Sequence, residues 1–130
     1  MPKMNIDIIK GHDRDYLKQL MDISYHVMLD CFGAPDGDRY QILTQHEDFE
    51  MNILDTGLGF DRTNDVVVFS LTTRPRTKEQ KLKFYHDLAE QLEDKLGIKK
   101  SDLMINLTTN TDEDWSFGNG VAQFIDGPLK

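Results

Sequence analysis

The two halves of the chain repeat one order of apolar, capping and turn residues, and this repeat constrains the fold more than any other feature. Five identical residues recur at one constant offset. Asp30, Gly33, Asp38, Leu43 and Thr44 match Asp94, Gly97, Asp102, Leu107 and Thr108. Each half has the pattern strand, helix, strand, so duplication of a β-α-β unit explains the match.

In the first half, Met4–Ile9 is apolar and rich in β-branched residues, which predicts a strand. A helix follows, with Asp13 as its N-cap and Gly33 at its end. Its apolar face carries residues at steps of three and four, namely Leu17, Leu20, Met21, Ser24, Val27, Met28 and Cys31. A second strand is predicted over Arg39–Gln45. Its side chains alternate, with Tyr40, Ile42 and Thr44 on one face and Gln41 and Leu43 on the other.

The second half starts with a predicted strand over Val66–Thr72. Thr77 and Gln80 have the spacing of a capping box, and Gly97 ends the helix that they begin. The predicted apolar stripe of this helix is Leu82, Tyr85, Leu88, Ala89, Leu92 and Leu96. A fourth strand is predicted over Leu103–Thr108.

Two such units predict an α+β fold in which a four-stranded sheet carries two helices on one face. The length of 130 residues suits one domain, 1–130. We place the first repeat at about 2–46, the second at about 65–109 and a C-terminal segment at 110–130. The connection 47–64 is long for a loop, so we expect it to carry some structure or to line a site.

The helix-free face of this sheet needs a cover. Val66–Phe69 is a continuous apolar run, typical of a strand that is buried on both sides. A chain of this size has no third layer to supply, so we expect a second copy to cover the face in a closed homo-oligomer. The alternative is that the connection 47–64 and the C-terminal segment cover it.

Composition limits the partners. A net charge of -8 disfavours nucleic acid and anionic membranes. Cys31 is the single cysteine, and the four histidines lack the spacing of metal ligands on one helix face, so we expect neither a disulfide nor a metal site. The start of the chain lacks the apolar core of a signal peptide, and these features together predict a cytoplasmic protein.

Pro2 directly follows Met1. Initiator methionine is normally removed ahead of a small residue, and removal here would leave the secondary amine of Pro2 free. Such an amine titrates near pH ~7.7–8.0 and is able to act as an acid, a base or a nucleophile. Taken alone, the Met-Pro pair indicates no more than an ordinary gene start, and the catalytic interpretation depends on the rest of the chain.

Arg74 and Arg76 flank Pro75 just after the third predicted strand. Pro75 favours extended backbone at Arg74, and alternate residues of an extended segment point the same way, so both guanidinium groups could bind one carboxylate. The alternative is a pair of solvated charges. Asp38 begins the second strand and could pair with a catalytic amine or orient water, or it could serve only the turn that precedes the strand.

The segment Trp115–Val121 contains the single tryptophan. Trp115 and Phe117 alternate around Ser116, so both rings could wall a pocket or could pack in the core. Asn119 and Gly120 between apolar residues predict a C-terminal hairpin.

Together these features resemble the tautomerase superfamily, and within it the malonate semialdehyde decarboxylase-like branch. The resemblance rests on the Met-Pro start, the doubled β-α-β plan, Asp38-Arg39, Arg74-x-Arg76 and the segment from Trp115 to Gln123. It implies a homotrimer with an active site at the amino-terminal proline. It further implies that Pro2, Asp38, Arg74 and Arg76 carry the chemistry. Its implied hydrophobic wall is Trp115, Phe117, Phe124 and Leu129.

The resemblance favours a cofactor-independent enzyme that acts on small acids bearing a carbonyl group. We expect decarboxylation of a 3-oxo acid such as malonate semialdehyde, with hydratase side activity. One alternative is a keto–enol tautomerase of phenylpyruvate-like substrates, in which Pro2 is neutral. Another is a non-enzymatic oligomeric binding protein.

Overall fold

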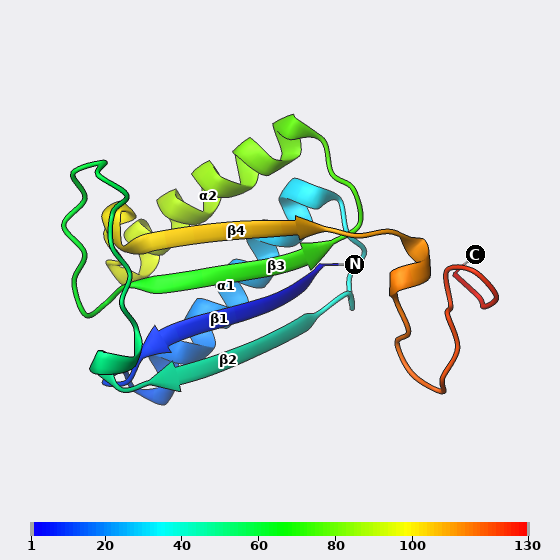
Figure 1. Ribbon diagram of the computed structural model, residues 1–130, viewed down its shortest axis with the longest axis horizontal. Coiled ribbons are helices and arrows are strands. Elements are labelled where there is room, and N and C mark those ends of the chain that lie inside the picture. The colour runs from blue at the N-terminus through cyan, green and yellow to red at the C-terminus, as the bar shows by residue number, and fades with distance from the viewer. Residues whose placement is uncertain (1, 130) are drawn as a thin grey trace.

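Both long helices lie on one face of a four-stranded sheet in the computed structural model, which describes residues 2–129 (Figure 1). The strands are β1 (Lys3–Ile9), β2 (Tyr40–His46), β3 (Val67–Thr73) and β4 (Leu103–Thr109). The helices are α1 (Arg14–Phe32) and α2 (Lys78–Leu96). Short 3-10 helices are η1 (Asp48–Glu50), η2 (Lys100–Asp102) and η3 (Asp112–Asp114). The predicted fold class is thereby confirmed.

The strand order is β2-β1-β3-β4. β1 pairs with β2 in parallel and β3 pairs with β4 in parallel, whereas the central pair β1 and β3 is antiparallel. Each parallel pair is joined by a crossover helix, as expected for two β-α-β units. The antiparallel junction puts the start of β1 beside the end of β3, so the segment that carries Pro2 and the segment that carries Arg74 and Arg76 meet at this end of the sheet.

The helix boundaries follow local capping chemistry. The Asp13 carboxylate accepts a hydrogen bond from the Tyr16 amide at 2.9 Å, and α1 ends at Gly33 with φ of 63°. Thr77 and Gln80 form the predicted capping box of α2, which ends at Gly97 with φ of 68°. Glycine adopts this left-handed conformation without the strain that a Cβ would add.

The core lies between the helices and the sheet. Ile6, Ile8, Phe69 and Leu71 point from β1 and β3 toward Leu20, Phe84, Leu88 and Leu92 of the helices. The predicted stripe of α2 was wrong at Leu82, which is 54% exposed, while Phe84 is fully buried. Leu82 and Phe84 lie on different faces of α2. The face of Phe84 is the one turned to the core, because its ring packs against that of Phe32 with ring centres 5.0 Å apart.

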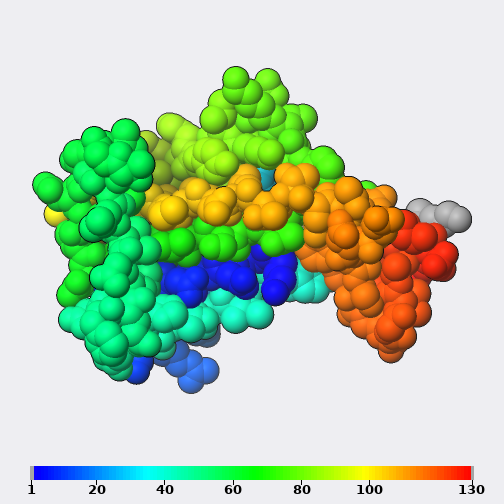
Figure 2. All heavy atoms as spheres, viewed as in Figure 1, coloured from blue at the N-terminus to red at the C-terminus, as the bar shows by residue number. Residues whose placement is uncertain are grey.

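The opposite face of the sheet carries no helix. Ile42 and Met104 point from this face into solvent, with 54% and 40% of their surface exposed. Figure 2 shows the strands in the middle of this face, between the connection 47–64 at one end and the C-terminal segment at the other. These two segments therefore do not cover the face, which contradicts the alternative that they do.

The connection 47–64 carries local structure, as predicted. It includes η1 and a turn in which the Asp55 carboxylate accepts hydrogen bonds from the amides of Gly57, Gly59 and Phe60. These bonds lower the pKa of Asp55. The connection lies at the far end of the sheet from residue 2, so it does not line the site described below (Figure 1).

The predicted C-terminal hairpin is reduced to a tight turn. Asn119 and Gly120 both have positive φ, of 61° and 68°, and a single antiparallel bridge joins Gly118 to Val121. No strand extends from it. The Gln123 side chain bonds the Phe117 amide and the Gly118 carbonyl, at 2.9 and 2.8 Å, and so occupies backbone groups that a strand partner would bind.

Within residues 2–129, neither helix is long and apolar enough to cross a membrane. The cytoplasmic location stays a prediction.

Candidate active site

Pro2 is buried at the start of β1. The next residue, Lys3, pairs with Thr72 near the end of β3 and with Tyr40 at the start of β2. Pro2 therefore lies beside the residues that precede β2 and those that follow β3. The antiparallel junction of the two repeats brings three segments together that are far apart in the sequence. Met1, whose removal the sequence predicts, lies outside the described residues.

Asp38 lies just before β2 and is only 5% exposed. Its amide donates to the Pro35 carbonyl at 3.2 Å, so it closes a turn, and Gly37 in this turn donates from its amide to the Tyr25 hydroxyl at 3.1 Å. Asp38 therefore serves the turn, and its buried carboxylate also stays a candidate partner for a catalytic amine.

Arg76 follows β3 and is held by neutral acceptors. Its Nε donates to Thr73 Oγ1 at 3.0 Å and its Nη1 donates to the Phe32 carbonyl at 2.9 Å. Burial, and then the charge of Arg74, hold the pKa of the Arg76 guanidinium below its usual value, while the charge of Asp38 opposes them. These effects mean that the three charged groups share one electrostatic environment.

Arg74 is held differently from Arg76. Its Nε forms an ion pair with Asp112 Oδ1 at 2.7 Å, and its guanidinium carbon lies 4.1 Å from the ring centre of Phe124. Asp112 belongs to η3, just after β4. The C-terminal segment is therefore connected to the arginine pair through Arg74.

An aromatic cluster borders this end of the open face. Phe117 stacks on Trp115 and on Tyr40 with ring centres 5.4 Å apart in each pair, and it meets Phe124 edge-on at 5.5 Å. Trp115 Nε1 donates to Asn110 Oδ1 at 2.8 Å, which fixes the indole. The Trp115 and Phe117 rings thus pack together and also present faces to a cavity.

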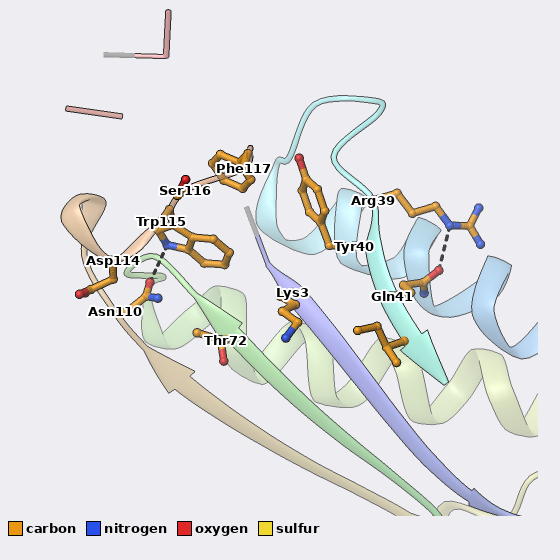
Figure 3. A pocket seen from close by; sticks show the side chains of 11 residues that line it. Lys3, Arg39, Tyr40, Gln41, Thr72, Asn110, Asp114, Trp115, Ser116 and Phe117 are labelled. Atoms are coloured by element: carbon orange, nitrogen blue, oxygen red, sulfur yellow. Dashed lines mark hydrogen bonds between the residues drawn. The ribbon is translucent and has the colours of Figure 1, made fainter. Parts of the chain in front are cut away.

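That cavity has a volume of about 670 Å³. Figure 3 shows the Phe117 ring between those of Trp115 and Tyr40, with Lys3 below them. Its full lining is Lys3, Arg39, Tyr40, Gln41, Ile42, Thr72, Asn110, Asp114, Trp115, Ser116 and Phe117. Size, aromatic walls and a single lysine at the base suit a small organic acid.

The structure divides the expected site residues into two groups. The strand register places the segments that carry Asp38, Arg74 and Arg76 beside Pro2, whereas Trp115 and Phe117 line the cavity. Phe124 connects the groups, because it contacts both Arg74 and Phe117. Leu129 is 47% exposed and does not line the cavity. The roles of all these residues stay predictions.

Sequence reasoning missed Lys3, Tyr40 and Asn110 as cavity residues. Lys3 and Tyr40 are neighbours on adjacent strands, which only the register reveals. Asn110 was detectable as a polar residue that directly follows a parallel strand. Among residues 2–129, no group of three or more histidine, cysteine or acidic side chains could hold a metal ion.

Comparison with known proteins agrees with this architecture. A sequence profile described as “Tautomerase enzyme” matches residues 38–118. The chain belongs to the tautomerase family. A relative in Bacillus subtilis (strain 168), “Probable tautomerase YrdN”, is 46% identical over 129 residues, covering 99% of this chain and 100% of the relative.

Two solved members of the family share the fold. A malonate semialdehyde decarboxylase, described with decarboxylase and hydratase activities, has a TM-score of 0.93 and 42% identity, covering 96% of this chain and 97% of that chain. FG41 malonate semialdehyde decarboxylase, inhibited by 3-bromopropiolate, has a TM-score of 0.91 and 33% identity, covering 96% and 95%. Because the chain belongs to an enzyme family, the alternative that it is a non-enzymatic binding protein is no longer needed.

Proposed function

We propose that this tautomerase-family enzyme decarboxylates small 3-oxo acids such as malonate semialdehyde without a cofactor, with water addition as a side activity. The observation that carries the proposal is the convergence of the β1 start, Asp38 and two guanidinium groups at one end of the sheet. The likeness to two malonate semialdehyde decarboxylases over almost the whole chain supports it.

In the proposed reaction, Arg74 and Arg76 bind the substrate carboxylate and polarise the neighbouring carbonyl. The carbon–carbon bond to the carboxylate breaks, carbon dioxide leaves, and the electron pair moves through the adjacent carbon onto the carbonyl oxygen. Cations fixed near that oxygen stabilise the transition state more than the ground state. The enolate then takes a proton at carbon to give the aldehyde.

Pro2 supplies the proton in this scheme. As a cation it donates a hydrogen bond, and then the proton, to the developing enolate. A neutral Pro2 amine would instead form an iminium with the carbonyl, which is an electron sink. The buried carboxylate of Asp38 favours the cation, whereas the two arginines oppose it. We propose that Asp38 prevails, and an NMR titration that finds a neutral Pro2 nitrogen at pH 7 would contradict this.

The test is release of carbon dioxide and aldehyde from malonate semialdehyde. We expect turnover by the natural enzyme and its loss in Pro2→Ala, with the oligomer unchanged in size. Efficient turnover by the variant would rule out the proposed role of Pro2.

A keto–enol tautomerase is the second candidate. The aromatic cavity walls of Tyr40, Trp115 and Phe117 favour it, because they suit an aryl ring. In this case Pro2 is neutral and shuttles a proton between carbon and oxygen. Trp115→Ala separates the candidates, since it should raise KM for phenylenolpyruvate far more than KM for malonate semialdehyde.

We further propose that the open sheet face forms the interface of a homotrimer. The exposed side chains of Ile42 and Met104 on this face support association, because single copies leave apolar surface in water there. Three copies is the number that the family resemblance implies. The cavity opens on the same face, so its rim would lie close to a neighbouring copy.

A further inference from the structure

The two arginines of the candidate site differ in what neutralises them. Arg74 forms a direct ion pair with Asp112 at 2.7 Å. Within residues 2–129, the hydrogen bonds of Arg76 go to two neutral oxygens, those of Thr73 and Phe32. The charge of Asp38 also acts on Arg76 and favours its cationic form. The pair therefore presents one compensated and one less compensated guanidinium.

Asp112 also fixes the direction of the Arg74 guanidinium. The carboxylate holds the Nε edge, and the Phe124 ring lies against the flat face at 4.1 Å. Within residues 2–129, the two terminal nitrogens of Arg74 make no hydrogen bond, so they are the part left for a ligand. A guanidinium held at one edge and one face needs little reordering when an anion binds.

Stability alone gives little reason for this ion pair. The Arg74 and Asp112 side chains are 38% and 48% exposed, and exposed pairs contribute about 0–1 kcal/mol. The same carboxylate has a larger effect on a ligand, because it lies on the same guanidinium group that an anion would bind and repels a second negative charge brought near it.

We propose that Asp112 is a positioning residue that orients Arg74 and limits the arginine pair to substrates with one carboxylate. This inference rests on the proposed function, because it assigns the charge of the substrate at the same site. Without Asp112 the site would hold an additional unpaired positive charge, which matches a dicarboxylate. The aspartate thus selects substrate charge rather than taking part in the reaction.

The test compares binding of 3-hydroxypropionate, which has one carboxylate, with binding of malonate, which has two. Both are titrated at pH 7 while NMR follows the arginine Nε–H and Trp115 indole N–H signals. The variants are Asp112→Asn, Asp112→Glu, and the control Glu113→Gln, which removes the same charge one residue away. Asp112→Ser removes it with a smaller side chain, should the asparagine variant fold poorly.

Asp112→Asn should strengthen malonate binding relative to 3-hydroxypropionate by about three- to tenfold, the range expected for one partly screened charge. It should also shift the Arg74 Nε–H signal. Asp112→Glu should preserve the natural ratio, and Glu113→Gln should leave it within twofold. An unchanged ratio in Asp112→Asn, an equal change in Glu113→Gln, or no binding of either anion would overturn the inference.

Binding is read here without turnover, so the two hypotheses fail separately. An enzyme that shows the shift in anion preference but does not decarboxylate 3-oxo acids would retain this role of Asp112 and lose the proposed function. An enzyme that turns over malonate semialdehyde but shows no change of anion preference in Asp112→Asn would retain the proposed function and lose this role of Asp112.

Discussion

Arg76 donates a hydrogen bond from Nη1 to the main-chain carbonyl of Phe32 at 2.9 Å, and this bond joins the two repeats at the candidate active site. Phe32 is the last residue of α1, where helix carbonyls lack partners within the helix. The partial negative charge at a helix C-terminus also favours a cation. The first repeat thus positions an arginine that the second repeat supplies.

Arg76→Lys should therefore lower kcat/KM by about 100-fold, since an ammonium cannot make both fixed bonds and also present a planar fork to a carboxylate. Steady-state kinetics with malonate semialdehyde would measure this. Arg62→Lys is the matched control, because Arg62 also donates to main-chain carbonyls, those of Leu54 and Ser101, but at the far end of the sheet. Equal losses in both variants would refute a specific role for Arg76.

Asp38→Asn should move the alkaline limb of the kcat/KM profile to lower pH. A nearby carboxylate raises the pKa of an amine, so its removal lets the Pro2 cation lose its proton earlier. Activity that requires the cation then falls at lower pH in the variant than in the natural enzyme. A profile that keeps its alkaline limb would argue that Asp38 does not act on Pro2.

Ile42→Asp should dissociate the oligomer while each copy stays folded. The side chain is 54% exposed on the open sheet face, so a charge there costs little in a single copy but would be buried between copies. Leu82→Asp is the control, because Leu82 is also 54% exposed but lies on α2, away from that face. Light scattering after size-exclusion chromatography would measure the mass of the oligomer for both variants. A control that dissociates equally would indicate a different interface.

Stability should fall at alkaline pH through Cys31. Burial raises the pKa of its thiol from 9.0 to about 11. Between these values the unfolded chain releases a proton that the folded chain retains, so the free energy of unfolding decreases as pH rises. Urea denaturation from pH 8 to 11 should show a shallower decline in Cys31→Ala. Parallel curves for the two proteins would contradict the assignment.

The sequence predicted the elements because local chemistry sets them. Asp13, Gly33, Thr77 and Gly97 bound the helices as predicted, and β2 alternates as its pattern indicates. Prediction failed on α2, where Leu82 and Phe84 lie on different faces and the predicted stripe included the exposed residue instead of the buried one. The predicted hairpin did not form because the side chain of Gln123, just after the turn, takes the hydrogen bonds of the Phe117 amide and the Gly118 carbonyl.

The candidate site was predicted only in part. Arg74 and Arg76 are visible as a motif, but their unlike partners are not, because Phe32 and Asp112 are far away in the sequence. Tyr40 joins the aromatic cluster through strand register, which a single sequence does not specify. The contacts between the two repeats, such as that of Arg76 with Phe32, are therefore known only from the structure.

The most direct test of the central claim changes only the amino terminus. Decarboxylation of malonate semialdehyde is measured for enzyme that begins at Pro2 and for enzyme with one extra residue ahead of Pro2, each verified by mass. The extension converts the secondary amine into an amide and leaves Asp38, Arg74 and Arg76 unchanged. We predict turnover only by the enzyme that begins at Pro2, and equal rates for the two proteins would contradict the account.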